Sequence, residues 1–162
     1  MQQYDTNAKV NPPLKTNKDR KAVIKGLQDG TIDAIATDNA PHNIESKNVE
    51  FNQAAMGMVG LETALGLVIT QLVETKCVTL RQAIEKITAT PAKILGLKKG
   101  TLLPGADADV IIVDPRVKWK VDAAQFASKS RNTPFNGWEL SGKVLCTIVG
   151  GKMVVRDGHL QV

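Results

Sequence analysis

Asp38 and His42 are the two side chains in this sequence whose types and positions best suit catalysis. They follow a short apolar segment, residues 32–37, which is typical of a buried strand in a parallel sheet. In barrels and open α/β sheets, reactive groups gather in the loops after the carboxyl ends of the strands. We therefore expect chemistry at Asp38 and His42.

The same stretch is also typical of a turn. Asp38 is followed by Asn39, Ala40 and Pro41. Aspartate and asparagine side chains bond the backbone just beyond them, and proline fixes φ. On these residues alone a turn is the favoured interpretation, because short motifs often match by chance.

A helix and a glycine turn precede the apolar segment, which is the αβ unit of a parallel α/β protein. Thr16 and Asp19 have the spacing of a capping box, and Asp29 and Gly30 end the helix. Residues 43–53 are polar and aperiodic, which predicts a long loop of a kind that often carries function. Further helices are expected over residues 61–72, after a cap formed by Thr79 and Gln82, and from a cap at Thr90 with Pro91 as first residue to Gly96.

The pattern changes from helical to β near residue 100. Residues 110–113 predict a strand, and two β-segments joined by Gly150 and Gly151 predict a hairpin. The sequence therefore predicts an α/β part over residues 1–99 and a small β part over residues 100–162.

The composition excludes several classes of protein. With 43% hydrophobic and 23% charged residues it is that of a soluble globular protein, and no run approaches the roughly 18 apolar residues of a membrane span. The start lacks a signal peptide, so we expect a cytoplasmic protein with no membrane partner. The net charge is +5, but basic residues alternate with acidic ones and aromatic residues reach only 4%, which argues against nucleic-acid binding. Cys77 and Cys146 are expected to be reduced core thiols.

Several stretches together resemble the C-terminal portion of the dihydroorotases, bacterial multi-metal members of the amidohydrolase superfamily. They are residues 9–14, 35–42, 57–65, 105–109 and 128–135. Separate motifs in the right order are more specific than any one of them, and they favour chemistry over a turn at Asp38. The resemblance implies an α/β fold: the C-terminal part of a (β/α)₈ metal-dependent hydrolase barrel, with residues 32–37 as its last strand, followed by part of a small β-sandwich.

The resemblance also implies a reaction, the interconversion of N-carbamoyl-L-aspartate and dihydroorotate at zinc in pyrimidine biosynthesis. Asp38 matches a metal ligand that takes a proton from water and returns it to the leaving amide nitrogen. Asn11, His42, Met56 and Gly57 match positions that contact the substrate. A turn role for Asn11 and a packing role for Met56 remain open as alternatives.

The chain departs from the family in its histidines. It has two, whereas the family's first strand supplies a His-x-His pair, and Asn39 stands where the family usually has His. His159 is expected to be exposed and without function. We therefore expect a fragment that is inactive alone and that self-associates or needs a complementing N-terminal polypeptide.

Two alternatives to the fragment and one alternative to the dihydroorotase reaction remain open. The chain could be one half of a split enzyme, or a non-catalytic dihydroorotase-like interaction subunit that serves, for instance, aspartate carbamoyltransferase. A cyclic amidohydrolase of the hydantoinase or allantoinase type is the third, since those enzymes use a similar aspartate at a strand end.

Overall fold

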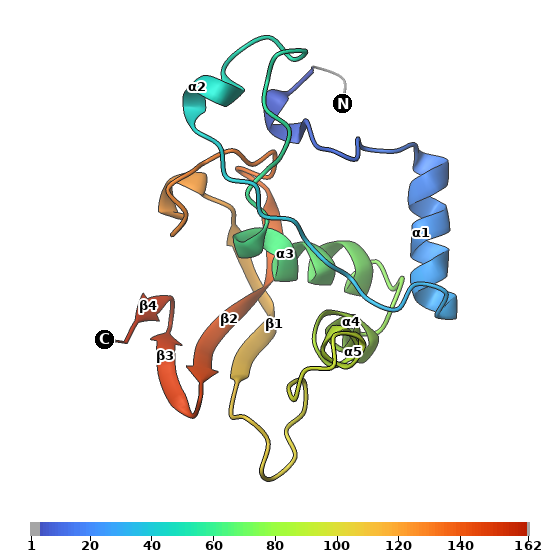
Figure 1. Ribbon diagram of the computed structural model, residues 1–162, viewed down its shortest axis with the longest axis vertical. Helices are drawn as coiled ribbons and strands as arrows, with labels where there is room; N and C mark the ends of the chain where they lie inside the picture. Colours follow the sequence, from blue (N-terminus) through green and yellow to red (C-terminus); the bar gives the residue numbers. More distant parts are fainter. Residues whose placement is uncertain (1–3, 162) are drawn as a thin grey trace.

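The computed structural model describes residues 4–161. Its elements are, in chain order, η1 (Thr6–Ala8), α1 (Asn17–Asp29), α2 (Ile44–Lys47), α3 (Leu61–Val68), the π-helical η2 (Ile69–Val73), α4 (Leu80–Ile87), α5 (Ala89–Ile94), β1 (Val110–Lys120), η3 (Ala123–Gln125), β2 (Glu139–Val149), β3 (Lys152–Arg156) and β4 (His159–Leu160). Every α-helix precedes the first strand (Figure 1). The beginning of the chain, where the sequence predicts no signal peptide, lies partly outside the described residues. Within residues 4–161 no helix has the length and apolar character to cross a membrane.

Helix α1 begins and ends where the sequence predicts. The hydroxyl of Thr16 accepts the Asp19 N–H at 3.3 Å, and the Asp19 carboxylate accepts the Thr16 N–H at 2.9 Å. The predicted capping box is therefore confirmed. Gly30 follows the helix with a φ of 84°, in the left-handed region that glycine adopts without strain.

The same capping box predicts how stability depends on pH. Hydrogen bonds from the hydroxyl and the amide of Thr16 hold the pKa of Asp19 below its ordinary value of 3.8. Because the folded pKa is the lower one, this stabilisation is complete above pH 3.8 and is lost as pH falls through the lowered pKa. The Tm difference between wild type and Thr16→Ala should therefore shrink between about pH 6 and about pH 2 in thermal unfolding. A difference that stays constant over this range would contradict the assignment.

Helix α3 lies between two hydrophobic clusters and joins the helical part to the sheet. A Cβ on Gly66 would lie 3.0 Å from Leu140 Cδ1, so glycine lets α3 approach the β1–β2 hairpin closely. The first cluster lies at this contact and consists of Val59, Val121, Ala123, Phe126 and Leu140, with Leu67 and Trp119 packed against it. The second, on the α1 and α4 side, consists of Leu27, Val68, Val78 and Ala83, with Ile32, Ile35, Leu72, Val73 and Ile87 packed against it.

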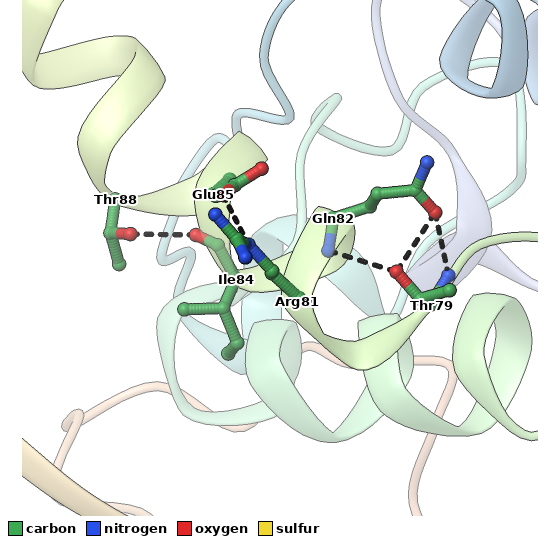
Figure 2. A network of polar contacts seen from close by, with 6 residues as sticks. All are labelled: Thr79, Arg81, Gln82, Ile84, Glu85 and Thr88. Atoms are coloured by element: carbon green, nitrogen blue, oxygen red, sulfur yellow. Dashed lines mark hydrogen bonds and ion pairs between the residues drawn. The ribbon is translucent and has the colours of Figure 1, made fainter.

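Helix α4 has the second predicted capping box, formed by Thr79 and Gln82 (Figure 2). The Gln82 N–H donates to the Thr79 hydroxyl at 3.2 Å, and the Gln82 side-chain oxygen accepts the Thr79 N–H at 2.9 Å. In the same helix, the exposed side chains of Arg81 and Glu85 form an ion pair at 2.9 Å. Each of these local interactions contributes little to the free energy of folding, but the capping box marks where the helix begins.

The predicted cap of α5 is wrong. The helix begins at Ala89 with Thr88 as its N-cap, so Thr90 and Pro91 lie inside its first turn. Thr88 is also the residue that ends α4, and its hydroxyl donates to the Ile84 carbonyl at 2.6 Å (Figure 2). The two helices share one boundary residue, which leaves no linker in which Thr90 could act as a cap.

Residues 32–37 do not form the strand that the sequence predicts. The segment is extended and crosses the molecule from α1 to α2 (Figure 1), but the strands of the described chain pair only with one another, in the order β1-β2-β3-β4. Its backbone bonds instead to helical residues: the Ile32 N–H donates to the Gly26 carbonyl and the Ile35 N–H to the Lys86 carbonyl, both at 2.9 Å. A strand exists only beside a neighbouring strand, and residues 4–161 do not place one next to this segment.

The predicted β-hairpin is confirmed. β2 and β3 pair antiparallel around Gly150 and Gly151, which have φ values of 55° and 78°. β1 is longer than the predicted residues 110–113 and pairs antiparallel with β2. The carboxylate of Asp109 accepts the Gly150 N–H at 2.8 Å and forms an ion pair with Lys99, which fixes the turn against the chain that leads into β1.

The cysteines are free, as the sequence predicts, but both are only partly buried. His159 lies in β4 and is exposed, as predicted.

Candidate functional site

Asp38 lies at the end of the extended segment, and its side chain is exposed. Its Oδ1 accepts the Asn39 N–H at 2.7 Å, and its carbonyl accepts the Thr37 hydroxyl at 3.0 Å. Its Oδ2 has no hydrogen-bond partner within residues 4–161. One oriented carboxylate oxygen is therefore available to a proton or a ligand.

Asn39 connects the Asp38 segment to the start of α3. Its Oδ1 accepts the Gly60 N–H at 3.2 Å. Gly60 is buried, and a Cβ there would lie 2.2 Å from the Asp38 carbonyl oxygen and 2.5 Å from Thr37 Oγ1. Only glycine fits this close approach, so the backbone of α3 fixes the position of Asp38.

Three of the predicted binding residues, His42, Met56 and Gly57, lie together. His42 Nε2 is 3.0 Å from the Met56 carbonyl oxygen, which can only accept, so this ring nitrogen carries a proton. Gly57 is buried with a φ of 133°, and a Cβ there would lie 2.4 Å from the Ala40 Cβ. Met56 is 53% exposed in this chain, and both its substrate contact and the alternative packing role stay predictions.

Asn11 is exposed, and within residues 4–161 no hydrogen bond joins it to the other predicted site residues. The connection runs through Lys9 instead, whose carbonyl accepts the Gly57 N–H at 2.8 Å. The structure therefore brings the Asn11 segment to the binding residues, but not the Asn11 side chain itself.

Lys47 holds the binding loop, residues 55–57, and this role was not predicted from the sequence. It is only 5% exposed, and its Nζ donates to the Ala55 carbonyl at 2.8 Å and to the Gly57 carbonyl at 3.0 Å. Burial lowers the pKa of Lys47 below its ordinary value of 10.5, and the nearby Asp5 partly opposes this. A lysine in a polar stretch predicts an exposed side chain, so the sequence carried no signal for this role.

Asn132 is the second residue that sequence reasoning missed, although it lies in a stretch that resembles the family. Its buried side chain accepts the His42 N–H at 3.1 Å and donates to the carbonyls of Ala40 and Gly57 at 3.0 and 3.2 Å. It belongs to the loop before β2 and thus connects the β part to the site.

A cavity of about 640 Å³ lies beside these residues. It is lined by residues of η1, of α2 and of the loop over residues 129–132, together with His42. Asp38 does not line it. Of the predicted site residues, the cavity therefore borders His42 alone.

The residues that the structure describes do not form a metal centre on their own. Within that part of the chain, no group of three or more His, Cys, Asp or Glu side chains lies close enough to hold an ion. Asp38 offers a carboxylate oxygen, whereas His42 Nε2 is bonded to the Met56 carbonyl. A protein zinc site needs at least three ligands, so Asp38 could be one ligand of a centre completed elsewhere.

Comparison with known proteins identifies the family of this chain. The model of the amidohydrolase family matches residues 6–154. The dihydroorotase of Pelotomaculum thermopropionicum is 58% identical over 154 residues, which cover 95% of this chain and 36% of the relative. The dihydroorotase of Geobacter metallireducens is 56% identical over 153 residues, which cover 94% of this chain and 36% of the relative.

Solved structures give the same result for the fold. The L-hydantoinase (dihydropyrimidinase) of Arthrobacter aurescens superposes with a TM-score of 0.91 at 33% identity, over 98% of this chain and 36% of that protein. The D-hydantoinase (dihydropyrimidinase) of a Thermus species gives 0.87 at 26% identity, over 96% of this chain and 35% of that protein. The chain thus spans about a third of the length of the proteins it matches.

The fold and the family predicted from the sequence are therefore confirmed at this level. The helices and the extended segment fit an α/β fold of the TIM-barrel type, to which the small antiparallel sheet is joined. Members of the family are hydrolases and generally depend on a metal ion. With the family model matching residues 6–154, this chain belongs to the amidohydrolase family.

Proposed function

We propose that this chain is the C-terminal part of a dihydroorotase, a zinc enzyme of pyrimidine biosynthesis that interconverts N-carbamoyl-L-aspartate and dihydroorotate. The observation that carries the proposal is the 58% identity with a dihydroorotase over 95% of the chain. Hydantoinases share the fold at 33% identity or less, which supports the alternative cyclic amidohydrolase less strongly.

In this proposal Asp38 moves the proton. In the hydrolytic direction, a water oxygen bonds to the ring carbonyl carbon while the bond from that carbon to the ring nitrogen breaks. Asp38 Oδ2, which lacks a hydrogen-bond partner in the described chain, takes the proton from the water and gives it to the leaving nitrogen. Because Oδ1 is held by the Asn39 N–H at 2.7 Å, the carboxylate keeps one orientation through both transfers.

Substrate binding falls to His42 and to the backbone of Met56 and Gly57, with Asn11 as a further contact. The substrate is an anion, which suits imidazole, amide and backbone N–H donors. The zinc ligands other than Asp38 have to come from the rest of the barrel, and no step of the reaction can be assigned to them from this chain.

Exposed apolar side chains support the need for the rest of a barrel and for the other half of a β-sandwich. Leu102, Leu103 and Leu160 are 81%, 72% and 76% exposed, which is unusual for leucine in a complete domain. The extended segment over residues 32–37 is open to pairing with a further strand. In this proposal the remainder of the protein, supplied as a complementing N-terminal polypeptide, covers these leucines and pairs with this segment. Self-association is the alternative.

The test is reconstitution of turnover. The chain is assayed with zinc for cyclisation of N-carbamoyl-L-aspartate, alone and mixed with the N-terminal two thirds of a related dihydroorotase. We expect turnover only in the mixture, and we expect Asp38→Ala to abolish it. The matched control is Asp33→Ala, because Asp33 is an exposed aspartate of the same segment that has no role in the proposal.

The other outcomes separate the alternatives. If light scattering shows that the mixture forms a complex, but the complex converts none of the substrates, the result would favour a non-catalytic interaction subunit. A mixture that hydrolyses hydantoin but does not cyclise N-carbamoyl-L-aspartate would favour the hydantoinase type.

A further inference from the structure

We propose that Asn132 is a positioning residue that holds His42 and the Met56–Gly57 pair in the arrangement that binds the substrate. This inference rests on the substrate-binding role proposed for those residues. Asn132 reaches them from the β part of the chain, so that part would take a share in specificity as well as in stability.

The geometry of the Asn132 amide requires an asparagine. Asn132 is only 5% exposed. Its side chain makes three hydrogen bonds, one with the His42 N–H and two with the carbonyls of Ala40 and Gly57. The first bond needs an acceptor and the other two need N–H donors, a combination that only a side-chain amide provides. The backbone carbonyl of Asn132 also accepts the Val59 N–H at 3.0 Å. One residue therefore joins the chain after Asp38 to the chain around Gly57.

The loop that carries Asn132 is itself held by α3. The carboxylate of Glu62 accepts the N–H groups of Ala127 and Ser128 at 2.9 and 3.1 Å. Phe126, just before them, is buried in the cluster between α3 and the sheet. Because the loop is fixed at this end, Asn132 can determine where the site residues lie rather than follow them.

Asp38 is held by other contacts. Its position depends on the Asn39 bond to Gly60, and none of the Asn132 side-chain bonds goes to Asp38. Loss of the Asn132 amide should therefore loosen the binding residues and leave the proton-transfer group in place. In kinetic terms, KM should rise more than kcat falls.

The first test is amide hydrogen exchange, measured on the 162-residue chain without any assay of activity. In Asn132→Ala the His42 amide loses its acceptor, and we expect it to exchange about tenfold faster while amides of β1 and β2 keep their rates. The matched control is Asn136→Ala, since Asn136 Oδ1 accepts the Ala123 N–H at 2.9 Å. That variant should speed exchange at Ala123 and leave His42 unchanged.

A second variant covers the case in which Asn132→Ala does not fold. Asn132→Asp keeps an acceptor for the His42 N–H but loses both donors to the carbonyls of Ala40 and Gly57. We expect its His42 amide to keep its exchange rate and its Gly57 amide to exchange faster. Unchanged exchange at Gly57 in Asn132→Asp, or at His42 in a folded Asn132→Ala, would overturn the inference. So would equally faster exchange throughout the sheet, because it would indicate only a structural role.

The second readout uses the reconstituted enzyme. Asn132→Ala should raise KM about tenfold and lower kcat by no more than about threefold, whereas Asn136→Ala should change neither. A fall in kcat of about tenfold with an unchanged KM would overturn the inference. If reconstitution gives no turnover with any substrate, the proposed function fails, and hydrogen exchange still decides whether Asn132 positions the loop.

Discussion

Replacement of Asp38 by Asn is expected to lower kcat of the reconstituted enzyme by about 10²- to 10⁴-fold, the usual contribution of a general acid and base. The amide has nearly the same shape as the carboxylate and can still accept the Asn39 N–H, which lies 2.7 Å from Oδ1. It cannot take a proton from water and return it. The fold should therefore remain while the chemistry is lost, and steady-state kinetics of the cyclisation measure this directly.

The control for this prediction is Asp33→Asn, which removes the same charge from the same segment. It should leave kcat within about twofold of wild type, because general acid and base catalysis requires direct contact with the reacting atoms. If Asp38→Asn also kept kcat within about threefold of wild type, Asp38 would not be the proton-transfer group. That result would favour the turn interpretation of this segment.

Gly60→Ala is expected to lower the free energy of unfolding by about 1–3 kcal/mol, the usual cost of overpacking a closely packed site. The φ of Gly60 is −119°, which any residue adopts, so the cost is steric. The new Cβ would lie 2.2 Å from the carbonyl oxygen of Asp38, and a backbone atom cannot rotate away as a side chain can. Urea unfolding of the isolated chain measures the change.

The matched control for Gly60→Ala is Gly26→Ala in α1. There the nearest atoms to a new Cβ are Cδ1 and Cγ1 of Ile32, both at 2.9 Å and both in a side chain rather than in the backbone. A gain of about 0.5–1 kcal/mol from placing alanine in a helix offsets that contact, so we expect little net change. Equal unfolding free energies for the Gly60→Ala and Gly26→Ala variants would show that the approach of α3 to Asp38 is not tight.

The elements that could be predicted from the sequence are those with local signals. The capping boxes of α1 and α4 each join residues three positions apart, and the β2–β3 hairpin turns on two adjacent glycines. Helix α2 had such a signal too, since Asn43 Oδ1 accepts the Ser46 N–H at 2.9 Å, but it lies within the polar residues 43–53 that predicted a loop. Side chains that bond within one turn leave a pattern in the sequence, and distant partners do not.

The predicted strand over residues 32–37 shows the limit of such patterns. Its nearly continuous run of apolar residues correctly indicated an extended segment, but strand pairing depends on a neighbour, and a segment's own composition does not specify one. The candidate site follows the same rule. Asp38, His42 and Gly57 could be proposed from the family resemblance, whereas Asn132 was missed because its partners Ala40 and His42 lie 92 and 90 positions away.

The bond between Asn132 and His42 spans 90 positions, and this has a consequence for the order of synthesis. Chains are made from the N-terminus at about 5–20 residues per second and fold as they emerge. A nascent chain that has passed α5 can already form its helices and the contacts of Lys9 and Lys47 with Gly57, but the hydrogen bonds of the Asn132 side chain form only after Asn132 leaves the ribosome. Asp38, the proposed proton-transfer group, thus emerges before Asn132, and the chain around His42 and Gly57 gains its contacts with Asn132 only after the later segment has been made.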